Sequence, residues 1–580
     1  MRIASSIHAA WRLYPGPGIP ENCLAGTLEP PGEALLLPDG SRIPGIEVPL
    51  PESGMLNLND LLPARLPYMT RCLLVGECVV PSECTVLLGI SVNWNWDVRL
   101  NGEMLCDAKP FRNGEHTFEP DDHLVRCHLK QGRNLFACDI GNGEDFQIAL
   151  QFYDDEDCFL KRRPLAHFPD AERNAVTISF ELTRIAPGGV LWRPLGENEW
   201  RRTYDTLGGQ IRRDTSLHHV RVTELARDTP YEYQVFYLDE PSGWGERILG
   251  GFERFRTLPG AGEPFSFVAT ADLQVPAERR EWMHSLFQRD YAKRAAFFAY
   301  LGDVLWTSDF EQMVMRDFID VFQNASGNSK MLEFVRGNHE YYGKDAQRYF
   351  AYFSAPDHGK DGYSMFRCGD VCFIVLDFGD DFGRCPYPST RALHCIDSYL
   401  DEQKRWLEMM IEQPICKEAT YRIVLAHAIP FGDWNEYLPG KIHRVIDPFF
   451  AGENPRCPIH LWLGGHVHYP LRTLPGQNAF RSMRGLPFET PEERMALERA
   501  GLLCGNRYFF PIVVFSGPSG MNPPELQISD VEVAVDGNEL RVISRDKNGT
   551  PYDQFAISAE RQLREISSAP AFGIRSINHE

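Results

Sequence analysis

The sequence has 580 residues, of which 43% are hydrophobic and 24% are charged, and its formal net charge at pH 7 is −21. A chain of this length should form about three to four domains, and the composition is that of a soluble globular protein. The acidic balance argues against a general nucleic-acid binder, because such proteins neutralise phosphates with a basic surface.

The 15 cysteines follow no regular spacing, and none forms a C-x-x-C pair. This pattern predicts neither a zinc knuckle nor a short disulfide framework, and it fits a reducing compartment. The first residues lack the apolar stretch of a secretory signal, and no run approaches the ~18 apolar residues of a membrane span. We therefore expect a soluble, cytoplasmic protein without a membrane partner.

An antiparallel β-sandwich is predicted for residues 71–152, where short alternating apolar runs are separated by turn residues. Within this segment Asn101-Gly102 and Asn113-Gly114 are strong hairpin signals, because asparagine and glycine both accept positive φ. We expect each pair to form the tight turn between two neighbouring antiparallel strands.

The run 92–100 and the later segment 129–134 resemble galactose-binding-like jelly-roll modules. The resemblance implies a β-sandwich domain over residues 1–164, with carbohydrate as a candidate partner. Trp94 and Trp96 share one face of the expected strand, since side chains alternate with a period of two. They either stack on a sugar or fill the sandwich interior, and large aromatic residues on a regular strand favour the interior.

A second all-β unit is predicted from about residue 173 to 258, where apolar and polar residues alternate over short runs. The stretch 225–235 is similar to the tyrosine-corner region of fibronectin type III domains, in which a tyrosine hydroxyl bonds back to the backbone. We therefore expect a fibronectin III-like sandwich over residues 165–260. His218 and His219 in this unit are interpreted as packing or surface residues, because no partner metal ligands lie nearby.

From residue 265 the pattern changes to alternating strands and helices, which indicates an α/β fold. Strands are predicted at 265–270, 297–301, 331–335, 371–376, 421–426, 459–463 and 509–515, with a hairpin at 531–542. Helices are predicted at 279–293, 309–322 and 401–411. Long segments at 378–400, 431–458 and 469–505 exceed the usual loop length and are candidates for substrate-shaping lids.

Polar clusters follow five of these apolar runs, namely Asp272-Leu273-Gln274, Gly302-Asp303, Gly337-Asn338-His339-Glu340, His427 and Gly465-His466-Val467-His468. Strands buried in the centre of an α/β sheet deliver such clusters to loops at their carboxyl ends, where open α/β sheets bind ligands. Carboxylate, amide and imidazole groups together can hold two adjacent divalent ions. The sequence therefore predicts a binuclear metal centre at this edge.

The order and spacing of these clusters resemble the calcineurin-like metallophosphoesterases. The resemblance implies a catalytic domain over residues 261–580 with a four-layer α/β core, in which two stacked sheets are flanked by helices. It also implies the ligand sets, one ion taking Asp272, Gln274, Asp303 and His468 and the other taking Asp303, Asn338, His427 and His466. A fibronectin-like domain ahead of such a core is similar to the N-terminal module of purple acid phosphatases.

Hydrolysis of phosphoesters is the activity that this resemblance implies, with small phosphomonoesters as the first choice of substrate. A metal-bound hydroxide attacks phosphorus, Asp303 bridges the ions, and His339 contacts the phosphate or protonates the leaving oxygen. The ions are manganese, iron, magnesium or zinc. Phosphodiesterase or nucleotidase activity is the alternative with the same site, and a non-catalytic scaffold with a degraded site is the alternative of a different class.

Two residues depart from the common patterns of these families. Gln274 stands where the commonest first motif has histidine, and its neutral oxygen favours manganese, magnesium or iron over zinc. Alternatively, Gln274 points away and leaves the site open. Trp306 stands where purple acid phosphatases carry a metal-binding tyrosine, so we expect no tyrosinate-iron colour.

The candidate substrate contacts are Arg336, Glu340, Arg384, His394 and Trp434. Arg336 could attract phosphate, and Glu340 could instead orient the neighbouring ligands. The other three lie in or beside the long segments, where ordinary loop packing is the alternative.

Overall fold

The computed structural model describes residues 3–20, 23–24, 29–92, 96–107, 120, 123–142, 146–155, 158–167, 175–274, 276–306, 308, 314–343, 346–353, 362–379, 395–431, 437–477, 479–483, 507–518 and 522–576. Trp94, Asn113, Gly114, Arg384, His394 and Trp434 lie outside these ranges. The chain forms two compact units, the first comprising Met1–Phe159, Arg184–Pro187 and Phe236–Ile248, and the second comprising Leu160–Thr183, Gly188–Val235 and Leu249–Glu580. Across the described ranges, none of the helices combines the length and apolar character that crossing a membrane requires.

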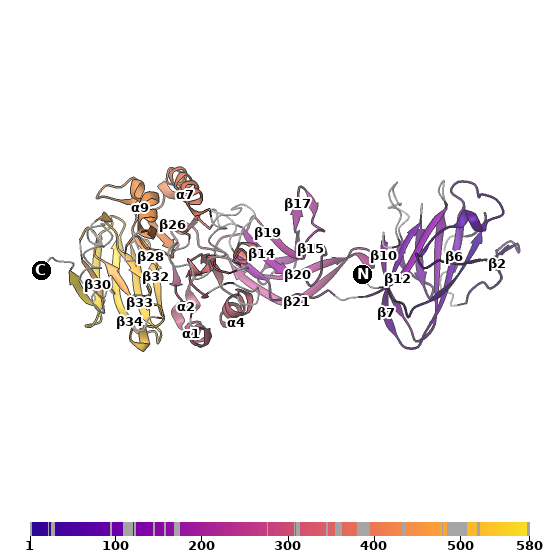
Figure 1. Ribbon diagram of the computed structural model, residues 1–580, viewed down its shortest axis with the longest axis horizontal. Coiled ribbons are helices and arrows are strands. Elements are labelled where there is room, and N and C mark those ends of the chain that lie inside the picture. The colour runs from indigo at the N-terminus through magenta and orange to yellow at the C-terminus, as the bar shows by residue number, and fades with distance from the viewer. Residues whose placement is uncertain are drawn as a thin grey trace. The chain divides into compact units, whose positions relative to one another are not determined.

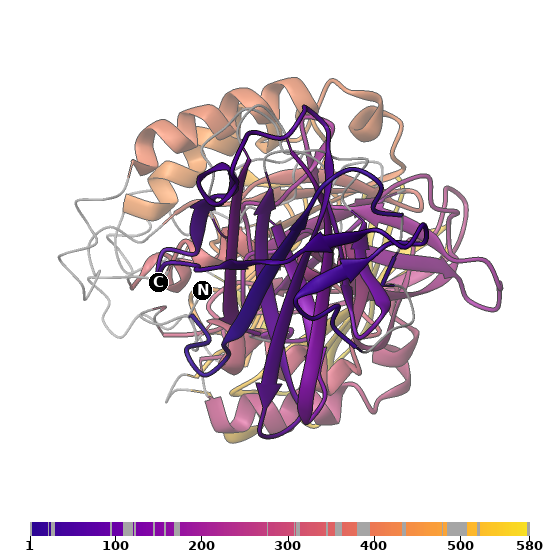
Figure 2. The ribbon, with the colours of Figure 1, turned by 90° about the vertical axis from the view of Figure 1, so that its right-hand side faces the viewer.

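The described residues of the first unit form two larger antiparallel sheets, with strand orders β4–β1–β6–β11–β8–β9 and β10–β7–β12–β5, and a two-stranded sheet of β2 Ala34–Leu36 and β3 Arg42–Pro44. Their bounds are β1 Ala9–Pro15, β4 Ile46–Val48, β5 Met55–Asn57, β6 Arg71–Val80, β7 Cys84–Val92, β8 Trp96–Leu100, β9 Glu103–Asp107, β10 His123–Leu129, β11 Gly132–Gly141 and β12 Gln147–Asp154. Figure 2 shows these indigo to purple strands running side by side.

The predicted hairpin at Asn101-Gly102 is confirmed, because both residues have positive φ, 51° and 84°, and they connect β8 to β9. The single strand expected over 92–100 was wrong. β7 ends at Val92, and β8 begins at Trp96 in the other sheet. Trp96 is only 1% exposed and packs in the hydrophobic core, so it fills the interior as expected rather than offering a surface to a sugar.

Two smaller sheets have the orders β13–β14–β19 and β16–β15–β20–β21, and they belong to the second unit except for the end of β20 and the start of β21, which fall within Phe236–Ile248 of the first. Their bounds are β13 Leu165–His167, β14 Val176–Glu181, β15 Gly188–Pro194, β16 Arg201–Tyr204, β19 Leu217–Val222, β20 Pro230–Asp239 and β21 Gly245–Arg256. The Tyr231 hydroxyl accepts a 2.9 Å hydrogen bond from the backbone N–H of Ala226, closing the corner ahead of β20. His218 is fully buried, with its Nδ1 2.9 Å from an Asp205 oxygen, and is therefore a packing residue.

The second unit also contains two larger sheets, with orders β24–β23–β22–β32–β33–β34–β35 and β25–β26–β27–β28–β31–β29–β30–β36. The first has β22 Phe265–Thr270, β23 Phe297–Leu301, β24 Met331–Val335, β32 Ser529–Val535, β33 Glu539–Asp546, β34 Pro551–Ser558 and β35 Leu563–Ser568. The second has β25 Ser364–Cys368, β26 Val371–Leu376, β27 Tyr421–Ala426, β28 Leu461–Gly464, β29 Leu471–Thr473, β30 Ala479–Ser482, β31 Ile512–Val514 and β36 Gly573–Ser576. β22, β23 and β24 are parallel, as are β26, β27, β28 and β31.

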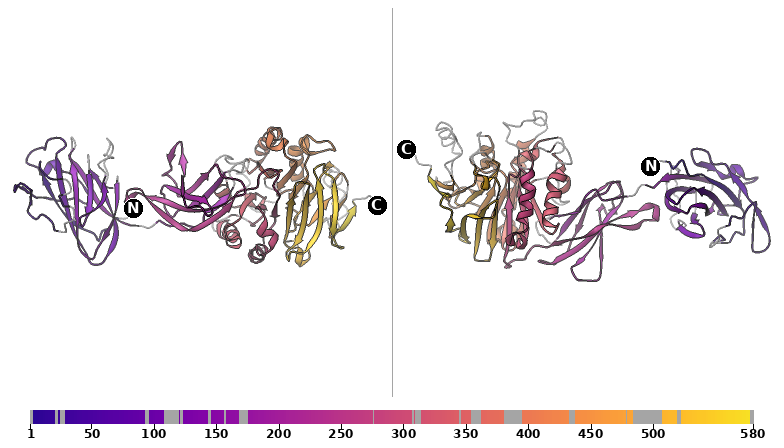
Figure 3. Two further views of the ribbon diagram at one scale, coloured as in Figure 1. Left: turned by 180° about the vertical axis from the view of Figure 1, so that it is seen from behind. Right: turned by 90° about the horizontal axis from the view of Figure 1, so that it is seen from below.

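Helices cover these two sheets on opposite sides. The helices α1 Pro276–Leu286, α2 Asp290–Arg294 and α4 Asp320–Ser326 share a hydrophobic core with the first sheet, and α7 Ile396–Met410 and α9 Tyr437–Phe450 share one with the second. Between the sheets, the Phe373 ring lies 5.1 Å from that of Phe267 and 5.4 Å from that of Phe297. Figure 1 shows α7 and α9 on one side of the strands and α1, α2 and α4 on the other, and the views from behind and below agree (Figure 3).

The predicted helix over 279–293 is broken, because α1 ends at Leu286 and α2 begins at Asp290. The helix expected at 401–411 begins earlier, at Ile396. The strand expected at 509–515 contracts to Ile512–Val514. Of the helix expected at 309–322, the described part consists of a π-helical turn at Met315–Ile319 followed by the start of α4.

Candidate metal centre

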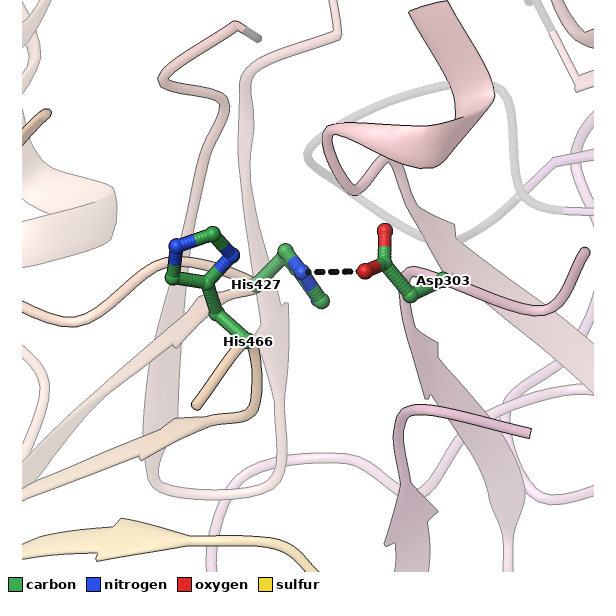
Figure 4. Close-up of side chains that lie close together, drawn as sticks. All are labelled: Asp303, His427 and His466. Atoms are coloured by element: carbon green, nitrogen blue, oxygen red, sulfur yellow. Dashed lines mark ion pairs between the residues drawn. The ribbon is translucent and has the colours of Figure 1, made fainter. Parts of the chain in front are cut away.

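Five loops at the carboxyl ends of parallel strands bring the predicted ligands together. Asp303, His427 and His466 each offer one ligand atom, and these atoms all lie within 4.8 Å of one another. Asp272, Asp303 and His468 form a second such group, so Asp303 belongs to both. Figure 4 shows Asp303, His427 and His466 facing one another, with His427 Nε2 3.2 Å from an Asp303 oxygen.

Amide side chains complete both groups. The Asn338 Oδ1 lies 2.9 Å from Nδ1 of His466 and 3.1 Å from Nε2 of His427. The Gln274 Nε2 donates to Asp303 at 3.2 Å, whereas its Oε1 is buried and has no hydrogen-bond partner among the described residues. All seven predicted ligands are thus gathered at one place, and an unpaired amide oxygen remains among them. Such an oxygen suits a cation.

Four of these residues occupy the left-handed region of backbone conformation, with φ of 57° at Asp272, 54° at Asp303, 74° at His466 and 57° at His468. This region costs an L-residue roughly 1–2 kcal/mol, and strain of this kind clusters at functional sites. The preceding Gly302 has φ of 84°, and a Cβ there would lie 2.5 Å from the neighbouring loop's backbone nitrogen. The loops therefore approach one another too closely for a side chain at that position.

Glu340 connects the loop after β23 to the loop after β24. Its carboxylate is fully buried and accepts hydrogen bonds from the backbone N–H groups of Gly337 at 2.7 Å, Asp303 at 2.8 Å and Val304 at 3.0 Å. Burial and the neighbouring charge of Asp303 raise the pKa of Glu340 to about 7. The interpretation of Glu340 as a substrate contact was wrong, because its oxygens are occupied and unreachable; it orients the ligand loops instead.

The buried acid and base at the centre stabilise each other's charge. Burial opposes the charge of His427, but the Asp303 carboxylate outweighs it and raises the pKa of His427 to about 10. Burial likewise opposes the charge of Asp303, yet His427 and then His339 hold the pKa of Asp303 below its ordinary value. A cation held by His427 and Asp303 would need the neutral imidazole, so its binding would release a proton.

His339 lies at the rim of the centre in a fixed orientation. Its Nδ1 is 2.8 Å from the carbonyl oxygen of Trp306, and since a carbonyl only accepts, Nδ1 carries the hydrogen. Its Nε2 lies 3.9 Å from Asp303, so the second ring nitrogen faces the ligands. The ring meets those of Trp306 and Tyr342 in T-shaped contacts with centroids 5.2 and 5.0 Å away.

Arg336 is bound to a buried carboxylate, and its role as a phosphate contact stays a prediction. Its side chain is only 11% exposed, and its Nε and a terminal nitrogen lie 3.0 and 2.7 Å from one Asp377 oxygen. The guanidinium also lies 3.7 Å from the centroid of the Tyr341 ring. Asp377 accepts further hydrogen bonds from the hydroxyls of Tyr341 and Tyr399, at 3.0 and 3.1 Å.

The sequence analysis missed Asp377. This residue directly follows the apolar run of β26, which is the same signal that identified the other site residues. Arg384, His394 and Trp434 lie outside the described residues.

Residues 265–470 match the family model for calcineurin-like phosphoesterases. No curated protein matches the sequence. Similar solved structures include purple acid phosphatase PPD1 from yellow lupin (Lupinus luteus) seeds, with 13% identity, TM-score 0.47 and coverage of 85% of this chain and 93% of that one. PhoD has 13% identity, TM-score 0.43 and coverage of 70% and 92%. A dimetal phosphatase from Danio rerio has 11% identity, TM-score 0.32 and coverage of 51% and 100%.

Proposed function

We propose that the calcineurin-like phosphoesterase domain carried by residues 265–470 makes this protein a metal-dependent phosphomonoester hydrolase. The observation that carries the proposal is the convergence of two overlapping ligand groups, Asp303 with His427 and His466 and Asp303 with Asp272 and His468. A degraded site in a scaffold protein would have no reason to keep four of these five side chains on strained backbone around one point.

The donor set fits two divalent ions with Asp303 between them. Asp272, Gln274 and His468 would hold one ion, and Asn338, His427 and His466 would hold the other. The unpaired Gln274 Oε1 and the Asn338 Oδ1 set between two imidazoles are donors that a cation would satisfy. Divalent ions held here supply the Lewis acidity that activates water and offsets charge on a phosphoryl group. The oxygen of Gln274 favours manganese, magnesium or iron in the first site.

His339 protonates the leaving oxygen in this proposal. Its Nδ1–H is committed to the Trp306 carbonyl, so the ring cannot rotate freely and Nε2 stays directed at the centre. A proton on Nε2 can pass to the departing alkoxide, whose charge would otherwise develop unsupported.

We extend the proposal to the architecture. Residues 261–580 form the four-layer core of the family, supported by the ring contacts between the sheets and the helices on their outer sides. Residues 165–260 form a fibronectin III-like domain, supported by the Tyr231 hydroxyl that bonds back to Ala226. Residues 1–164 form a jelly-roll-like sandwich, supported by the two larger antiparallel sheets of the first unit.

The test compares a chromogenic monoester with the diester of the same alcohol, using metal-depleted protein before and after addition of manganese. We expect turnover only with metal and faster turnover of the monoester. Asp303→Ala and His339→Ala should each lower turnover at least about 100-fold, whereas His284→Ala, an exposed histidine on α1, should not. Faster diester cleavage would assign a phosphodiesterase, and unchanged rates in both site variants would support the scaffold.

A further inference from the structure

Trp306 is an aromatic surface left open beside the metal centre. It is 50% exposed, although it lies three residues after Asp303 in the same loop. Among the described residues, the one ring that contacts the indole is that of His339, which meets it nearly at a right angle of 81°. A large part of the indole surface is therefore available to a ligand at the rim of the centre.

The position of Trp306 relative to His339 decides which part of a substrate it can touch. The backbone carbonyl of Trp306 holds Nδ1 of His339 at 2.8 Å, and the centroid of the indole lies 5.2 Å from that of the imidazole, so the indole is next to the proposed proton donor. Attacking and leaving oxygens lie on opposite sides of the phosphorus in an in-line displacement. The group that protonates the leaving oxygen and a surface next to that group both stand on the leaving-group side.

The chemistry of the indole selects the kind of leaving group. A neutral ring cannot neutralise phosphate, but its flat face stacks on another planar ring in an offset geometry. The indole N–H makes no hydrogen bond to any described residue, so it remains a donor for a heteroatom of a ligand. We propose that Trp306 binds the leaving group and that the substrate is a phosphoester of a planar aromatic alcohol. This inference rests on the proposed hydrolytic function.

The kinetic test uses two monoesters whose alcohols have similar acidity, phenyl phosphate and hexafluoroisopropyl phosphate, so that leaving-group chemistry is matched and planarity differs. Trp306→Ala should lower kcat/KM for phenyl phosphate about tenfold or more, the fold-change of losing one stacked ring. It should change the value for the fluorinated ester less than about twofold. Trp306→Phe should retain most of the preference, because it keeps a ring.

Trp244→Ala is the matched control, since Trp244 is 41% exposed but belongs to the first unit. It should leave both esters unaffected. Equal losses on both esters in Trp306→Ala would overturn the proposal, because Trp306 would then act only through His339. A wild-type preference for a sugar phosphate or for a quaternary ammonium alcohol would overturn it as well.

A binding experiment separates failure of this inference from failure of the proposed hydrolysis. Phenylphosphonate and methylphosphonate, which are not hydrolysed, are titrated calorimetrically into the manganese-loaded protein. We expect phenylphosphonate to bind about tenfold more tightly or better, and the difference to vanish in Trp306→Ala. If no ester is cleaved but phenylphosphonate still binds more tightly than methylphosphonate, the inference about Trp306 is supported and the proposed hydrolytic function is contradicted. Equal binding of the two phosphonates overturns the inference.

Discussion

The carboxylate of Glu340 accepts a 2.8 Å hydrogen bond from the backbone N–H of Asp303, the residue common to both ligand groups. The same carboxylate reaches the backbone of the loop after β24 at Gly337. One buried acid, which touches neither the ligand atoms nor solvent, therefore fixes the spacing between two of the loops that carry them. Three backbone donors converge on it, and each would be orphaned by its loss.

Replacing this acid tests whether it positions the centre. Glu340→Gln keeps the shape but replaces one acceptor oxygen with an NH2 group facing an N–H donor, which leaves buried donors unsatisfied. We expect manganese affinity to fall about 10- to 100-fold, as for other residues that orient ligands from behind, and the melting temperature to fall. Titration calorimetry and thermal unfolding measure the two effects. Glu281→Gln, on the exposed face of α1, is the control; equal affinities in the two variants would refute the role.

Asp303 belongs to both ligand groups, whereas Asp272 belongs to one. We therefore predict that the loss of each carboxylate has a different effect on metal binding. Asp303→Asn should weaken both ions, because the bridging negative charge that offsets their repulsion is lost. Asp272→Asn should weaken only the ion it shares with His468. Elemental analysis after dialysis should find close to no metal in the first variant and about one ion per chain in the second. The same stoichiometry in both would show that Asp303 does not bridge.

We predict that the ion pair of Arg336 and Asp377 affects turnover by positioning the loop that carries Asn338 and His339. Asp377→Asn leaves the guanidinium buried without its counter-charge, and breaking a buried pair in this way costs roughly 3–5 kcal/mol of stability. Because Arg336 directly precedes the loop of Asn338 and His339, we expect a lower kcat with little change in KM. Steady-state kinetics and thermal unfolding check both effects. The exposed pair of Arg256 and Asp228 offers the control Asp228→Asn, which should change neither. A raised KM alone would indicate phosphate contact instead.

We predict that the stability of the fold decreases at acidic pH because of His460, which lies outside the candidate metal centre. Its Nδ1 accepts from the backbone N–H of Arg422 at 3.1 Å while its Nε2 donates to the Ala559 carbonyl at 3.0 Å, so the fold requires the neutral ring. Burial lowers the pKa of His460 to about 4. The unfolded chain therefore binds the extra proton first, and stability present above pH 6.5 is lost as the pH falls toward 4.

At pH 5 this loss amounts to about 2 kcal/mol. His460→Asn, which retains an acceptor and a donor, should remove that part of the difference between pH 7 and pH 5. Denaturant unfolding at the two pH values measures it. His284→Asn, at an exposed position, should keep the full wild-type difference. An identical pH dependence in wild type and His460→Asn would contradict the argument.

Much of the catalytic core could be predicted from the sequence because its central strands are buried on both faces. Such strands appear as continuous apolar runs, and β22, β23, β24, β26 and β27 have the predicted bounds. The polar residue after each run then marks the edge where ligands meet. For this reason the seven candidate ligands could be selected together, although they span almost 200 residues of sequence, from Asp272 to His468.

The directions of the Arg336 and Glu340 side chains could not be predicted, because they depend on contacts between segments that are distant in the sequence. Arg336 and Glu340 lie in the same loop as the predicted ligand Asn338, and nothing local distinguishes them. Arg336 is held by the buried carboxylate of Asp377, 41 residues further on. Glu340 turns inward because three backbone N–H groups from two loops meet there. The direction of a loop side chain is set by partners that spacing alone does not reveal.

β22, the strand that precedes Asp272, pairs with a strand that comes much later in the sequence. β22 ends just before Asp272, yet it pairs antiparallel with β32, and the Thr270 hydroxyl donates to the Ser529 carbonyl 259 residues away. On the ribosome, the nascent chain therefore exposes one edge of β22 until β32 has been synthesised. A chain truncated before β32 would leave that edge, next to Asp272, without its partner strand.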